Sequence, residues 1–156
     1  MAENNIYGFL PSILITTLLK LEHIDISNNG MWAGTEHNYD GFVDMSFPSS
    51  TSYVNYSHNQ FSGVSFKRFN AAYETLKVLD LSNNKISQDL STIFYNIPPN
   101  IQELLLSSNL IKGNLPDPFP LQTIISFAIA KNSIDGTLPN FPIYTLHLKG
   151  SYMYTV

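Results

Sequence analysis

The sequence predicts a solenoid, a right-handed coil of about six to seven turns. Two observations support this fold class. An asparagine recurs at nearly constant intervals, and apolar residues keep fixed offsets before and after it. Each turn is expected to add one short strand to a parallel β-sheet on the concave face, and a short helical or extended segment to the convex side. The predicted architecture is therefore of the α/β or mostly β class.

The repeat is anchored on six asparagines at intervals of 25, 30, 25, 25 and 23 residues: Asn4, Asn29, Asn59, Asn84, Asn109 and Asn132. In the five complete copies, the positions eight, five and three before the asparagine are mostly apolar, as in Leu76, Leu79 and Leu81. Another apolar residue stands two positions after each asparagine, and glycine follows at the fourth position in four copies. A degraded copy begins at Ile143.

The apolar offsets assign the strands and the core. In an extended chain, Leu79 and Leu81 point to one face and Asp80 to the other. We therefore expect parallel strands around 24–26, 54–56, 79–81, 104–106, 127–129 and 146–148, with the leucine columns buried between stacked turns. Where each strand ends, an asparagine amide can both donate and accept hydrogen bonds. We expect the six asparagines, Asn84 among them, to be buried and to bond the backbone of adjacent turns.

The segments "LKVLDLSNNKI" (76–86) and "IQELLLSSNLIKGNLP" (101–116) resemble the plant-type leucine-rich repeat, LxxLxLSxNxLxGxLP. The resemblance extends from Asn4 to about Met153, with Tyr56 and Phe127 in place of leucines and one longer interval. It implies a module like those of receptor-like ectodomains and polygalacturonase-inhibiting proteins, which bind proteins, peptides or glycans. It also favours an extracellular or cell-surface location, which neither a signal peptide nor cysteines support.

Composition excludes several classes of function. With a net charge of −4 and no basic stripe, the 156-residue chain is not expected to bind nucleic acid. The absence of cysteine excludes disulfides, cysteine-ligated zinc and a cysteine nucleophile. The four histidines are scattered, and no phosphate loop or paired-carboxylate site is evident. We therefore expect no enzyme activity, no cofactor and no metal.

The two ends bear on domain organisation. The apolar stretch at 6–21 has no basic residues before it and lies in repeat register, so we interpret it as part of a repeat rather than a signal peptide. It is too short for a membrane span, and no membrane insertion is expected. We expect residues 1–156 to form a single solenoid, either a portion of a longer one or a short one with ends covered by partners.

Candidate binding residues lie on the concave face of the first turns and in the insertion loop 32–47. Two interpretations remain for the residues on the concave face. They could form a ligand-binding patch, or they could simply be solvated, with Asp25 and Asp80 as ordinary residues of the repeat. Trp32, Phe42 and Phe47 of the insertion could bind a partner or fold back over the core. The predicted binding residues are His23, Asp25, Trp32, Tyr39, Tyr53, Asn55, His58, Asp80 and Glu103.

Three further features of the sequence have a structural interpretation rather than a functional one. The segments 66–76 and 90–96 have helix-like apolar spacing and are expected to be core-facing turns of the convex wall. A glycosylation sequon begins at Asn55, but a glycan there would block the concave face, so we expect it to be unused. His37, Asp40 and Asp44 have no fourth ligand at a fixed spacing, and a metal site is not expected.

Two hypotheses for function follow. The first is non-catalytic recognition of a protein, peptide or glycan through the concave face and the 32–47 loop. The second is a structural or accessory subunit packed into a larger assembly, which would contact the ends and the convex wall near Tyr7, Phe9, Tyr152 and Tyr154.

Overall fold

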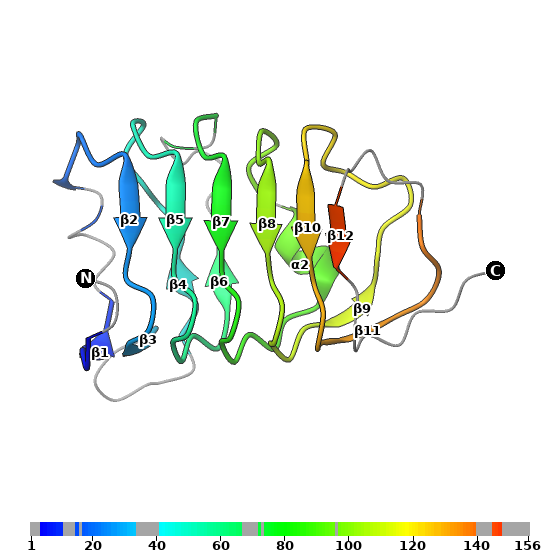
Figure 1. The fold of residues 1–156 in the computed structure, drawn as a ribbon, viewed down its shortest axis with the longest axis horizontal. Coiled ribbons are helices and arrows are strands. Elements are labelled where there is room, and N and C mark those ends of the chain that lie inside the picture. The colour runs from blue at the N-terminus through cyan, green and yellow to red at the C-terminus, as the bar shows by residue number, and fades with distance from the viewer. Residues whose placement is uncertain are drawn as a thin grey trace.

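A computed structural model describes residues 4–10, 15, 17–33, 41–66, 72, 74–95, 97–139 and 145–147. Six short strands form one parallel sheet in the order β12-β10-β8-β7-β5-β2, and they stand side by side along the molecule (Figure 1). The prediction of a parallel-strand solenoid is confirmed, and about five turns separate the first strand from the last. The strands are β2 (His23–Asp25), β5 (Tyr53–Asn55), β7 (Val78–Asp80), β8 (Glu103–Leu105), β10 (Ser126–Ala128) and β12 (Thr145–His147).

Every pairing within this sheet is parallel and in the predicted register. Val54 pairs with Leu79, Leu79 with Leu104, and Leu104 with Phe127. Each strand begins one residue earlier than predicted, so its central residue is the apolar one. The central side chains of β2 to β10 are buried while most residues flanking them are exposed or half-buried, as the alternation of an extended chain requires.

The asparagine ladder follows each strand. The Asn84 Nδ2 donates to the carbonyls of Tyr56, Leu81 and Ser82 at 3.0–3.2 Å, and its Oδ1 accepts from the Phe61 amide at 3.0 Å. Asn59, Asn109 and Asn132 repeat this pattern and are buried. The predicted hydrogen bonds are confirmed for these four asparagines and for Asn29. Burial is less complete than predicted at three positions, because Asn84 and Asn29 are half-buried and Asn4, in the first turn, is exposed.

A second set of strands, which the sequence did not predict, follows the ladder. It consists of three two-stranded parallel sheets that lie beyond the carboxyl ends of the main strands (Figure 1). Gly113 lies within one of these strands with φ 99°, a left-handed conformation that favours glycine. The pairs are β1 (Tyr7–Phe9) with β3 (Gly30–Trp32), β4 (Val43–Asp44) with β6 (Val64–Ser65), and β9 (Lys112–Asn114) with β11 (Ser133–Asp135).

The helix α2 (Leu90–Tyr95) lies behind the main sheet (Figure 1). Its Leu90, Ile93 and Phe94 are buried, which confirms the prediction for 90–96. Of the other predicted wall segment, Phe66 and Leu76 are buried, while Phe69 and Tyr73 lie outside the described residues.

Aromatic residues fill the core where leucine is replaced. Phe127 packs against Phe94 and Phe119, with ring centroids 6.1 and 5.4 Å away. Tyr56 packs between Phe47 and Phe61, at 6.1 and 5.6 Å. Burial of such rings is a large contribution to the stability of a solenoid, because no single turn can bury its apolar face alone.

The 30-residue interval lies between Asn29 and Asn59 and contains the insertion loop. Its second half forms β4, which pairs with β6, and the following Phe47 is 2% exposed. The interpretation that Phe47 folds over the core is confirmed. Phe42 remains 57% exposed, and its ring occupies the space that a side chain at Gly63 would fill. His37, Tyr39 and Asp40 lie outside the described residues.

Candidate binding surface on the six-stranded sheet

The outward-pointing residues of the six strands form a surface that we call the strand face. Its residues lie in two rows that cross the strands, because the strands are paired in register. The first row begins with the aromatic residues of β2 and β5, and the second with acidic and amide residues. The first row is His23, Tyr53, Val78, Glu103 and Ser126, and the second is Asp25, Asn55, Asp80, Leu105 and Ala128.

The first row contains an aromatic stack. The rings of His23 and Tyr53 lie with centroids 5.6 Å apart and planes inclined by 24°. His23 is exposed and Tyr53 half-buried, so the stack lies on the surface. Parallel pairing of β2 with β5 places the two side chains directly opposite each other, close enough for rings to stack. The sequence predicted their proximity.

The second row has a structural role as well as a surface position. The Oδ1 atoms of Asp25, Asn55 and Asp80 accept hydrogen bonds at 2.9, 3.0 and 2.9 Å. The donor in each case is the backbone amide two residues later, the Asx-turn pattern of short polar side chains. These bonds direct the chain out of the strand. The interpretation of Asp25 and Asp80 as repeat residues therefore gains a physical basis, and both remain on the strand face.

The Asp25 carboxyl is held in its charged form. Partial burial raises its pKa, but hydrogen bonds from the Ser27 hydroxyl and amide and from Asn55 lower it more, so the pKa lies below its ordinary value of 3.8. Asp25 is therefore ionised near neutral pH.

His58 lies in the turn after β5 rather than on the strand. It is exposed and adopts φ 53°, and the equivalent residue of every described turn is also left-handed. Such a conformation is costly for residues other than glycine and is best tolerated by asparagine. The repeat uses asparagine twice at this position, and the full set is Asn28, His58, Asn83, Ser108 and Lys131.

The structure does not bring all the predicted residues together. Trp32, which was predicted for the insertion loop beside the concave face, lies on β3, where it pairs with Phe9 in a two-stranded sheet. Tyr39 lies outside the described residues. Glu103 is on the strand face but two strands from Tyr53. The strand face therefore unites His23, Asp25, Tyr53, Asn55 and Asp80.

Sequence reasoning missed the residues directly before each strand. Glu22 and Gln102 are exposed, Lys77 is half-buried, and Ile125 is 45% exposed. Each stands seven positions before its asparagine, so the constant offset was the signal that could have identified them. They stand directly before the strands and border the strand face.

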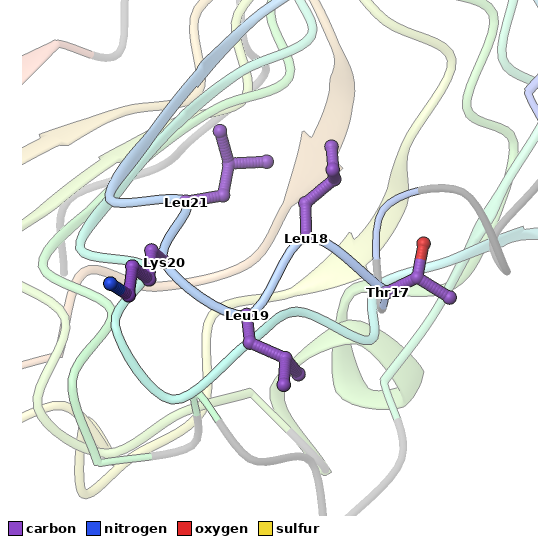
Figure 2. A pocket seen from close by; sticks show the side chains of 5 residues that line it. All are labelled: Thr17, Leu18, Leu19, Lys20 and Leu21. Carbon is purple, nitrogen blue, oxygen red and sulfur yellow. The ribbon is translucent and has the colours of Figure 1, made fainter.

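A shallow cavity of about 480 Å³ lies near the first turn and is lined by Thr17, Leu18, Leu19, Lys20 and Leu21. Figure 2 shows the side chains of Leu18 and Leu21 on one side of this segment and that of Leu19 on the other. Leu18 and Leu19 are 47% and 74% exposed. The described lining of the cavity is apolar apart from Thr17 and Lys20.

The part of the chain that the structure describes contains neither a metal-binding cluster nor a membrane-spanning helix. No three or more of its histidine, aspartate and glutamate residues are grouped so as to hold a metal ion. None of its helices is both long enough and apolar enough to cross a bilayer.

Comparison with known sequences gives two relatives from Arabidopsis thaliana. Receptor-like protein 32 is 31% identical over 116 residues, which cover 74% of this chain and 13% of that protein. Receptor-like protein 54 is 32% identical over 133 residues, which cover 75% and 16%. The chain thus spans a small part of each relative. The family model described as Leucine Rich Repeat matches residues 75–97 and 100–121.

Comparison with solved structures identifies the same fold. The plant peptide hormone receptor RGFR1, solved in complex with RGF2, superimposes with a TM-score of 0.73 at 21% identity, over 98% of this chain and 24% of the receptor. A plant ice-binding protein gives 0.70 at 18%, over 98% and 48%. A TDR receptor gives 0.61 at 15%, over 97% and 30%.

Proposed function

We propose that this chain, which belongs to the plant-type leucine-rich repeat family, is a non-catalytic recognition module that binds a peptide or protein through its strand face. The observation that carries the proposal is the His23–Tyr53 stack beside the Asp25–Asn55–Asp80 row, which places aromatic and polar groups together on one accessible surface. Aromatic side chains offer large contact areas at low entropic cost and dominate binding hot spots.

The comparisons support a ligand-recognition role and a peptide as the ligand. One structure with this fold is a peptide hormone receptor in complex with its ligand, and the two sequence relatives are receptor-like proteins. By analogy, this chain would act at the cell surface or outside the cell. The strand face is the surface that the sequence assigned to ligand binding, and solenoids commonly bind along such a face.

A second candidate is a subunit of a larger assembly. The observation that favours it is the group of exposed apolar residues in the first turns, where Leu19 is 74%, Tyr7 70% and Phe9 39% exposed. Exposed apolar groups of this kind are typical of surfaces that contact another protein. Tyr152 and Tyr154, predicted for the same role, lie outside the described residues.

A peptide selection tests the first proposal. The 156-residue chain is immobilised and challenged with a phage-displayed library of random seven-residue peptides, and the affinity of each selected peptide is then measured. Tyr53→Ala should weaken binding by about 2 kcal/mol or more, while the melting temperature stays nearly unchanged. The matched control is Leu110→Ala, because Leu110 is 60% exposed and follows Asn109, away from the strand face.

Two outcomes would reject the strand face. One is a selection that yields no binding peptide. The other is a set of peptides that bind Tyr53→Ala as tightly as the natural chain. Leu18→Ser and Leu19→Ser then test the assembly alternative, since they should reduce self-association in sedimentation velocity only if the first turns form an interface.

A further inference from the structure

The charge of the strand face is concentrated and predominantly negative. The strands β2, β5, β7 and β8, with the residue before each, contribute four carboxylates and one ammonium group, a net charge of −3. The entire chain carries −4. Most of the excess negative charge therefore lies on the surface proposed to bind. These charges belong to Glu22, Asp25, Asp80, Glu103 and Lys77.

The aromatic stack lies within this negative field. Tyr53 is opposite His23 and Val78 in the first row, and Asn55 with its acidic neighbours lies in the second row of the same strands. The described residues give the Tyr53 hydroxyl no hydrogen-bond partner. A planar cation suits this arrangement, because a guanidinium group stacks on an aromatic ring and hydrogen-bonds carboxylates with the same atoms. A compact ammonium group lacks the planar surface that stacking requires.

The strand face changes character along the sheet. From β8 onward the second row continues as Leu105, which is half-buried, and Ala128, and the row before the strands ends in Ile125, which is 45% exposed. The second row is therefore acidic and polar at β2 to β7 and apolar at β8 and β10, while the first row still carries the exposed Glu103 on β8. Six strands at a spacing of about 4.8 Å extend over about 24 Å, the length of an extended peptide of about seven residues.

We infer that the ligand of the strand face is an extended peptide that crosses the strands, with an arginine on the His23–Tyr53 stack between the acidic residues and apolar residues over Leu105 and Ala128. This inference rests on the proposed function and adds the chemistry and the direction of the ligand. Charge complementarity selects a basic peptide, and stacking selects arginine over lysine. The gradient from acidic to apolar fixes which end of the peptide lies on β2.

The same peptide selection tests the inference through the composition of the selected pool. Arginine should be enriched over lysine, aspartate and glutamate depleted, and apolar residues should gather at the opposite end from arginine. The double variant Asp25→Asn, Asp80→Asn removes the charge and keeps the Oδ1 acceptor, since Asn55 makes the same turn with an amide. It should weaken the selected peptides by about tenfold or more, and high salt should reduce the difference.

Two further variants sharpen the test. Asn55→Asp adds a third carboxylate between the other two and should tighten binding of arginine peptides. Asp135→Asn is the matched control, because Asp135 is exposed on β11, outside the strand face, and should leave affinity unchanged.

The outcomes separate the inference from the proposed function. A pool without excess arginine that still requires Tyr53 would overturn the inference and leave the proposed function standing. Arginine-rich peptides with equal affinity for the double Asn variant would also overturn it. Peptides that bind independently of both Tyr53 and the carboxylates would overturn the inference and the proposed function together.

Discussion

Gln88 pairs its side-chain carboxamide with the backbone of Val64 in both directions. Its Oε1 accepts from the Val64 amide at 2.6 Å, and its Nε2 donates to the Val64 carbonyl at 2.9 Å. Val64 belongs to β6, whose other side pairs with β4. The side chain thus supplies the hydrogen bonds that another strand would make, because a carboxamide carries the same donor and acceptor as a peptide group.

Gln88→Ala should therefore destabilise the fold by about 1–3 kcal/mol, since it leaves buried backbone groups of Val64 unpaired. Urea denaturation followed by circular dichroism measures this change. Gln60→Ala is the matched control, because Gln60 is exposed and its side chain contacts Lys85 at the surface; the change there should stay within about 0.5 kcal/mol. Equal midpoints for the two variants would show that the Gln88 pairing contributes nothing.

The ladder predicts a similar loss at Asn84. Asn84→Ala removes the donors to Tyr56, Leu81 and Ser82 and the acceptor for Phe61, and should cost about 1–3 kcal/mol in the free energy of unfolding. Asn83→Gly is the control: the neighbouring asparagine is exposed, and its φ of 55° suits glycine. If Asn84→Ala unfolds at the same urea concentration as the natural chain, the ladder is not a source of stability.

Much of the main sheet could be predicted because one rule determines it. Offsets from the asparagine placed Leu79, Leu104 and Phe127 in the core and Asp80 on the surface, and the paired strands match these positions within one residue. The second set of strands could not be predicted in this way. β4 belongs to the insertion, which follows no repeat, and a strand such as β9, with the sequence KGN, has no apolar alternation to mark it.

The site was predicted in part for the same reason. Residues on the strands, such as His23 and Tyr53, were placed together because strand register follows from the repeat. Trp32 was assigned to the insertion loop from its residue type and its place in the sequence, and the structure shows it as the last residue of β3. It stands three positions after Asn29, the offset at which Tyr7 follows Asn4, and both residues lie in the β1–β3 sheet. Offset was the more informative signal.

Tyr56 predicts a stabilising substitution. Its ring is fully buried, and its hydroxyl is buried without a hydrogen-bond partner among the described residues. Burial, with a smaller effect from Asp44, raises the pKa of Tyr56, so the hydroxyl stays protonated. Tyr56→Phe should leave the free energy of unfolding unchanged or raise it by about 1 kcal/mol, because it removes a buried polar group and keeps the ring.

Tyr56→Leu, which restores the repeat residue, is the companion variant. It should lower stability, because a cavity would open between Phe47 and Phe61. A clear loss of stability in Tyr56→Phe, measured by the urea midpoint, would mean that the hydroxyl makes a hydrogen bond in solution.

Lys131 predicts a stabilising change of backbone origin. Its φ is 55°, a conformation that costs about 1–2 kcal/mol for a residue with a Cβ. Lys131→Gly should raise the melting temperature, with a net gain of about 0.5–1 kcal/mol after the added entropy of the unfolded chain. Lys112→Gly should instead lower the melting temperature, since Lys112 lies in β9 and glycine weakens a strand. The prediction is wrong if both substitutions destabilise equally.

Asp89 predicts a pH dependence of stability. It precedes α2, and its Oδ1 accepts from the Ser91 hydroxyl at 2.6 Å and from the Ser91 amide at 2.9 Å. These two bonds, with the charge of Lys112 as a smaller cause, hold the pKa of Asp89 below its ordinary 3.8 although burial opposes them. A carboxyl group whose pKa is lower in the folded state than in the unfolded state binds a proton less readily when the protein is folded. Its stabilisation is complete above the unfolded pKa and is lost as the pH falls through the folded pKa.

Asp89→Asn should therefore lower the urea midpoint, relative to the natural chain, by more at pH 6 than at pH 2.5. At the lower pH, protonation removes the charge from the natural side chain as well. Ser91→Ala isolates the main cause. Without the Ser91 hydroxyl, the Asp89 pKa should rise toward its ordinary value, which NMR titration of the carboxyl carbon measures directly. If the Asp89 pKa is the same in Ser91→Ala and in the natural chain, the hydroxyl is not what lowers it, and the proposed pH dependence loses its main cause.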